Sequence, residues 1–131
     1  MTNTRVVPGP GFRICFDDEP HYLRGYVFDG TDSKAVSIAM WNMLAAECRA
    51  RQADRLLVLE DLIATVDVSE IESVIDAMLA AGLDKVRIAF VELRDDIQGS
   101  ELGESMCLER GIVTRIFSNE PEARRWLIYG E

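Results

Sequence analysis

The residues best placed to do chemistry lie in one short segment, LEDLIATVDVSE, which follows a run of apolar residues. The segment begins with two adjacent carboxylates, Glu60 and Asp61, which could work as an acid and a base or bind a divalent metal. An acid–base pair needs two different environments, and a metal needs further oxygen ligands. Adjacent residues of a strand point to opposite faces. We therefore expect one of the two in water at the strand end, and we predict no catalytic or metal site.

The second half of the segment places a serine among acids, with Asp67, Ser69 and Glu70 close together. Ser69 and Glu72 have the S-x-x-E spacing of a capping box, in which the serine oxygen accepts a hydrogen bond from a backbone N–H of the first helical turn. We predict that Ser69 caps a helix over residues 70–81. The loop before it is a candidate contact surface for a partner, with Ile63, Thr65 and Ile71 as the contact residues.

The other reactive side chains show no recognisable pattern. His21 is the only histidine, with no triad partner and no second zinc ligand, so we place it at the surface. The three cysteines are widely spaced in apolar contexts and are predicted to be core thiols: Cys15, Cys48 and Cys107. A second acidic group is predicted to be a solvated surface that could attract Mg²⁺ or a basic partner: Asp95, Asp96, Glu101 and Glu104.

Composition narrows the classes of partner. The chain has 131 residues, 48% of them apolar, and a net charge of −9. A surface this acidic repels phosphate backbones and anionic lipids, so we expect no nucleic-acid partner. We find no apolar run of membrane-spanning length and no signal-peptide core in MTNTRVVPGPG, and we predict a cytoplasmic protein without membrane insertion. GxGxxG, Walker and HExxH motifs are absent from the sequence, and we predict no cofactor.

Hydrophobic periodicity predicts the elements that must position these residues. Residues 1–10 are expected to be a flexible N-terminal segment, and residues 11–131 one α/β domain. Five strands are predicted over residues 12–16, 22–28, 56–59, 86–93 and 112–117, and four helices over 34–51, 70–81, 101–109 and 121–129. The order ββαβαβαβα indicates a single-layer, mainly parallel five-stranded sheet with an N-terminal β-hairpin. Gly25, inside the second strand, indicates a bulge or a close backbone approach.

This pattern resembles the STAS and SpoIIAA-like superfamily, named for the anti-sigma factor antagonists of sporulating bacteria. The segment LLVLEDL…DVSEI looks like that family's strand, acidic strand end and D-S-S-G-L loop, and the ending IFSNEPEARRWL is similar to that of small bacterial members. In those regulators a partner kinase phosphorylates a loop serine, and phosphorylation abolishes binding. The resemblance matches Asp67 to the family's Asp and Ser69 to its phosphorylated Ser. Val68 and Glu70 replace the family's Ser and Gly, and Glu70 adds like-charge repulsion to any phosphate on Ser69.

The resemblance implies a non-enzymatic regulatory or protein-interaction domain with a protein partner. Two other functions stay open. The domain could carry a small apolar ligand or a lipid in a pocket, or it could be an enzyme that uses the acidic strand ends with a metal. Met40 and Met43 with Trp41 could form a soft apolar patch, which, if exposed, could bind a partner or a second copy of the chain as a homodimer.

Overall fold

The computed structural model describes residues 4–94 and 97–130 of the chain. Within these residues, six strands form one sheet in the order β1-β2-β3-β4-β5-β6. The strands are β1 (Thr4–Gly9), β2 (Phe12–Asp18), β3 (Leu23–Thr31), β4 (Arg55–Ile63), β5 (Arg87–Glu92) and β6 (Thr114–Phe117). The helices in the same residues are α1 (Lys34–Arg51), α2 (Ile71–Ala80), α3 (Ile97–Glu109) and α4 (Glu120–Tyr129).

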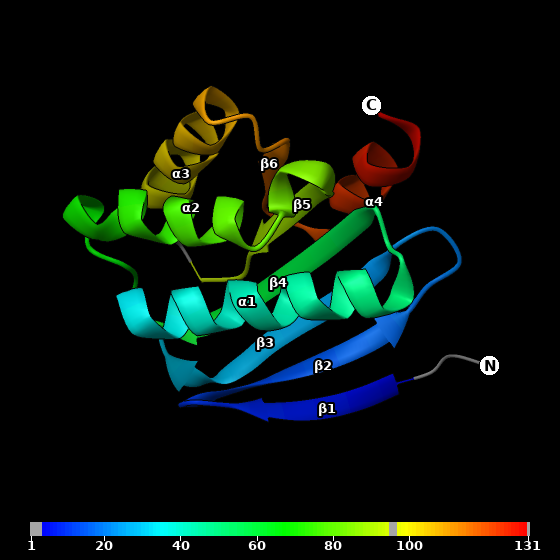
Figure 1. The fold of residues 1–131 in the computed structure, drawn as a ribbon, viewed down its shortest axis with the longest axis horizontal. Helices are drawn as coiled ribbons and strands as arrows, with labels where there is room; N and C mark the ends of the chain where they lie inside the picture. The colour runs from blue at the N-terminus through cyan, green and yellow to red at the C-terminus, as the bar shows by residue number, and fades with distance from the viewer. Residues whose placement is uncertain (1–3, 95–96, 131) are drawn as a thin grey trace.

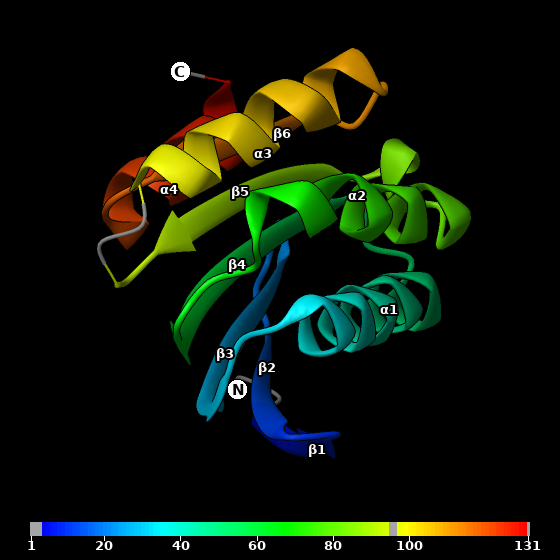
Figure 2. The ribbon, with the colours of Figure 1, turned by 90° about the vertical axis from the view of Figure 1, so that its left-hand side faces the viewer.

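The sheet is mixed. β1, β2 and β3 pair antiparallel, and β3, β4, β5 and β6 pair parallel. Helices α1, α2 and α3 cover one face of the sheet, and α4 covers the other face over the parallel strands (Figures 1 and 2). The predicted α/β class, with helices between parallel strands, is confirmed.

The N-terminal segment departs from the prediction. Thr4–Gly9 is strand β1, paired along the edge of the sheet with β2, so the expected flexible lead-in is wrong for these residues and the sheet has six strands in place of five. The prediction took Pro8 and Pro10 as signs of irregular chain. An edge strand tolerates proline because one side of its backbone needs no ladder hydrogen bond. Gly11 has φ +90 in the turn to β2, a conformation that glycine adopts without strain.

Helix boundaries follow from local capping. Ser33 precedes α1 and its side chain accepts a hydrogen bond from the backbone N–H of Val36, while Gln52 ends the helix in the left-handed conformation. Asn119 caps the N-terminus of α4, where its side chain accepts a hydrogen bond from the backbone N–H of Glu122. The predicted range of α1, residues 34–51, is confirmed.

Strand β4 is buried on both faces, as its apolar sequence predicted. Leu56, Val58 and Leu62 belong to the core under α1 and α2, and Leu57 and Leu59 belong to a second core under α4. By the same alternation, residue 60 faces the three-helix side and residue 61 faces the α4 side.

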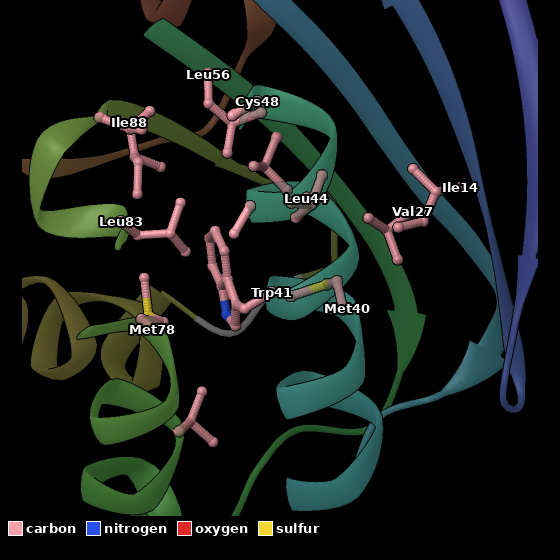
Figure 3. Packing of buried hydrophobic residues seen from close by; sticks show 14 of the residues in the cluster. Ile14, Val27, Met40, Trp41, Leu44, Cys48, Leu56, Met78, Leu83 and Ile88 are labelled. Carbon is pink, nitrogen blue, oxygen red and sulfur yellow. The ribbon is translucent and has the colours of Figure 1, made fainter. Parts of the chain in front are cut away.

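Gly25 on β3 allows α1 to lie close against the sheet. A Cβ added at Gly25 would lie 2.7 Å from Cδ2 of Leu44, a fully buried residue of α1. Figure 3 shows Leu44 in the core between this helix and the strands. The close neighbour at Gly25 is therefore the Leu44 side chain of α1, where the sequence indicated a bulge or a close backbone approach.

Candidate functional site

A cavity of about 130 Å³ lies between α1, α2, α3 and the face of the parallel strands. Most of its wall is apolar: Met40 and Trp41 from α1, Ile75 and Met78 from α2, Phe90 from β5 and Ile116 from β6. Figure 3 shows Trp41 reaching from α1 toward Met78 and Leu83. The Trp41 and Phe90 rings are tilted against each other with centroids 6.0 Å apart. Ligands of α/β folds collect at the carboxyl ends of parallel strands, where this cavity begins.

One end of the cavity is acidic. Glu60, near the carboxyl end of β4, and Glu92, the last residue of β5, are only 6% and 8% exposed, and they pair in register on neighbouring parallel strands. Asp32, which follows β3, and Glu104, on α3, also line the cavity. Among the residues that the structure describes, the lining includes these four carboxylates and no lysine, arginine or histidine. The arrangement favours a positively charged group over a negative one.

Local hydrogen bonds fix the positions of two of these acids. Glu92 accepts from the backbone N–H of Arg94 through Oε1, at 2.9 Å, and from the Ser100 hydroxyl through Oε2, at 3.3 Å. Asp32 Oδ1 accepts from the Ser33 N–H at 2.8 Å and from the Ser37 hydroxyl at 2.7 Å. Because α1 and α3 supply these hydroxyls, both helices contribute to holding the acidic end in shape.

Asp61 points away from the cavity, as the strand alternation predicted. Its carboxylate accepts hydrogen bonds from the Tyr26 hydroxyl and from Nε of Arg94, each at 2.7 Å. These two bonds lower the pKa of Asp61. The first bond also raises the pKa of Tyr26, with smaller contributions from burial and the Asp61 charge. Glu60 and Asp61 therefore lie on opposite faces and do not form an acid–base pair.

Glycines of α3 leave the room that the cavity occupies. Gly99 and Gly103 both line it, one helical turn apart. A Cβ added at Gly103 would meet nothing within 4 Å. The sequence predicted a helix that starts at residue 101, whereas α3 begins at Ile97 and includes Gly99. Glycine inside a helix destabilises the helix relative to alanine. Gly99 and Gly103 therefore lower the stability of α3 at the two positions where the missing side chains leave space for the cavity.

The far end of the cavity has an unsatisfied polar atom. Thr114 on β6 is 5% exposed, and its Oγ1 has no hydrogen-bond partner among the described residues. The neighbouring Cys107 thiol offers it only a weak sulfur contact. Buried hydroxyls are usually hydrogen-bonded, so this atom marks a place where a ligand or a water molecule would complete the site.

The cysteines give a direct test of burial around the cavity. Burial raises the pKa of Cys48 to about 12, and burial raises that of Cys107 to about 11. Cys15 on β2 is half-buried. Only thiolates react rapidly with Ellman's reagent. We expect one thiol per native chain to react at pH 8 and three in urea. A Cys15→Ser variant should lose the native reaction, and fast labelling of all three native thiols would contradict the packing.

The predicted serine cap is wrong in detail. A 3₁₀ turn over Val68–Glu70 precedes α2, and Asp67 caps that turn. Oδ1 of Asp67 accepts from the Ser69 backbone N–H at 2.9 Å and from the Ser69 hydroxyl at 2.6 Å. Helix α2 starts at Ile71 with no side-chain cap. The extra turn moves the helix start past the serine, so Ser69 donates to the cap residue.

Substitutions of Asp67 and Ser69 distinguish the observed Asp67 cap from the predicted Ser69 cap. We expect Asp67→Ala to lower the urea midpoint of unfolding more than Ser69→Ala, because Asp67 accepts both hydrogen bonds. Those bonds lower the pKa of Asp67 in the folded state. The stability that Asp67 adds to the folded domain is therefore present above the pKa that its carboxyl has in the unfolded chain. This stability is lost as the pH falls through the lower pKa of the folded state. A larger loss with Ser69→Ala than with Asp67→Ala at pH 7 would restore the serine-cap scheme.

Two of the three predicted contact residues, Thr65 and Ile71, line the cavity. Ile63 ends β4 with 55% of its surface exposed, and Val68 in the loop is 63% exposed. Thr65 is exposed, Ile71 is half-buried, and both line the cavity. Glu70 is half-buried at the helix start. The loop between β4 and α2 thus forms part of the cavity wall and presents apolar side chains to solvent.

Of the remaining candidates, those that the structure describes lie on α3 and in the turn between β2 and β3. Asp95 and Asp96 lie outside the described residues. Glu101 is exposed on α3 and His21 is exposed in the β2–β3 turn, whereas Glu104, which was predicted to lie on a solvated surface, lines the cavity. In residues 4–94 and 97–130 we find no group of three or more His, Cys, Asp or Glu side chains arranged to hold a metal ion.

None of the described helices is both long and apolar enough to cross a bilayer. Comparisons with protein-family models, with curated proteins and with solved structures found no match. The site is therefore interpreted from its own geometry.

Proposed function

We propose that this domain binds a compact, largely apolar small molecule in the cavity between α2, α3 and the parallel strands. The observation that carries the proposal is the cavity itself, an apolar pocket with a few polar groups gathered at the strand ends. Binding sites for small molecules combine these two features, with the apolar wall supplying affinity and the polar groups fixing orientation.

The size of the cavity limits the ligand. An apolar cavity of roughly 150 Å³ is enough to hold a molecule such as benzene. The cavity here is close to that, at about 130 Å³. A single ring or a short branched chain fits, and a larger molecule needs the loop between β4 and α2 to move.

Binding of a small probe tests this function. Benzyl alcohol is neutral and ring-sized, and we expect it to change the fluorescence of Trp41 saturably. Trp126, which packs in the other core, is removed by a Trp126→Phe background so that Trp41 alone reports. Cyclohexanol serves as a second neutral probe of similar size. Failure of both probes to saturate the signal, with folding verified by circular dichroism, would reject the ligand-binding function.

The exposed loop favours a second candidate function, a regulatory contact with a protein partner. Ile63 and Val68 project apolar surface beside Ser69, whose hydroxyl is exposed. This is the surface that the family resemblance assigns to partner binding. The test is a pull-down from the native cell with Glu70→Lys and Ser69→Ala variants. The proposal predicts that a partner retained by the parent chain is lost with Glu70→Lys, and retention by both variants would reject it.

A further inference from the structure

We infer that the ligand is an organic cation, with an ammonium group bound by Glu60 and Glu92 and an apolar body that extends along β5 toward β6. The inference rests on the proposed ligand-binding function and adds the chemical class of the ligand.

The first argument is the sign of the charge at the strand ends. Glu60 and Glu92 lie in register on adjacent strands and are less than a tenth exposed. Side chains at paired positions of neighbouring strands are close enough to interact, and like charges there are destabilising. A bound ammonium group would reduce this repulsion, and it would donate up to three hydrogen bonds to the carboxylate oxygens.

The second argument is the rest of the cavity. A metal ion or a free ammonium ion would use only the acidic end, whereas most of the wall is apolar and includes the paired rings of Trp41 and Phe90. An aromatic face also attracts a nearby cation. The wall therefore indicates an apolar body attached to the charged group.

The third argument is independent of the acids and comes from Thr114. Its hydroxyl is buried, lines the cavity and lacks a hydrogen-bond partner among the described residues. Thr114 pairs with Ile88, four residues before Glu92 along β5. At about 3.3 Å per residue the two ends of the site are roughly 13 Å apart. A ligand that reaches both ends is longer than a single ring, so it requires the loop between β4 and α2 to move, and it carries a hydrogen-bonding group at the end opposite its ammonium group.

The experiment compares probes of one shape and different charge. Binding of benzylammonium, benzyl alcohol and benzoate to the Trp126→Phe protein is measured by Trp41 fluorescence at pH 7. A charge-assisted hydrogen bond contributes enough for about tenfold in affinity or more. We expect benzylammonium to bind at least about tenfold more tightly than benzyl alcohol, and benzoate to bind least.

Two variants of nearly unchanged shape and one control locate the charged group. We expect Glu60→Gln and Glu92→Gln each to weaken benzylammonium by about tenfold and to leave benzyl alcohol within about twofold. Glu101→Gln changes an exposed acid of α3 outside the cavity lining, and it should leave both probes within about twofold. This pattern would support the inference.

Two results would overturn the inference and leave the proposed function intact. One is equal binding of benzylammonium and benzyl alcohol. The other is tight benzylammonium binding that neither glutamine variant weakens. If none of the three probes binds, the ligand-binding function itself fails, and the inference fails with it.

Discussion

Replacing Gly103 with leucine is expected to abolish binding of small apolar molecules while the domain stays folded. Gly103 lines the cavity, and a Cβ there meets nothing within 4 Å, so a leucine side chain can enter the space without displacing backbone. The four added carbon atoms would occupy the volume in which a ring-sized probe binds. We expect the affinity for benzyl alcohol, measured by Trp41 fluorescence, to fall by about 30-fold or more, which corresponds to losing roughly 2 kcal/mol of apolar burial.

Gly103→Ala is the matched control for this experiment. It fills only one methyl volume, and it should raise the stability of the domain by about 0.5–1 kcal/mol because alanine favours a helix interior over glycine. We expect benzyl alcohol to bind this variant within a few-fold of the parent. Unchanged binding to a folded Gly103→Leu variant would show that the probe binds elsewhere.

Shortening Leu44 to alanine is expected to have the largest effect on stability. Leu44 is fully buried where α1 lies against β3. Truncating such a leucine removes buried apolar surface and leaves a cavity, which costs about 3–5 kcal/mol. Because domains of this kind are stable by only about 5–15 kcal/mol in total, urea denaturation should show a large shift of the midpoint.

The contact between Leu44 and Gly25 gives this prediction an internal control. Gly25→Ala alone should destabilise the domain by about 1–3 kcal/mol, because the added Cβ is too close to Leu44. In the double variant the new methyl group occupies space that Leu44 vacated. The double variant should therefore lose less stability than the sum of the losses in the two single variants. Strict additivity would show that the helix and strand are not packed as described.

Local signals predicted much of the fold. The ranges of α1 and α4 were predicted closely, and the structure identifies their capping residues as Ser33 and Asn119. The error at Thr4–Gly9 has a physical cause, since a proline-containing segment becomes a strand only when a partner edge pairs with it. The early start of α3 was missed because glycine lowers helix propensity, and packing outweighs that preference.

The site was harder to predict because its residues meet only in the folded sheet. Glu60 at a strand end resembled a solvent-exposed residue, yet it follows Leu56 and Val58 on the same face, and this alternation was a signal that it would be buried. Its pairing with Glu92 depends on the register of β4 and β5, which sequence spacing does not specify. The loop around Ser69 was located from the sequence, and its regulatory role stays a prediction.

Methyl resonances of methionine offer the most direct measurement of the central claim, that this cavity binds small molecules. Met40 and Met78 line the cavity, whereas Met43 lies near Gly9 of β1, away from the lining. During titration of ¹³C-methyl-labelled protein with benzyl alcohol, we predict saturable shifts for Met40 and Met78 and an unchanged Met43 resonance. Shifts at Met43 with stationary Met40 and Met78 resonances, or no saturable shift at all, would contradict the claim.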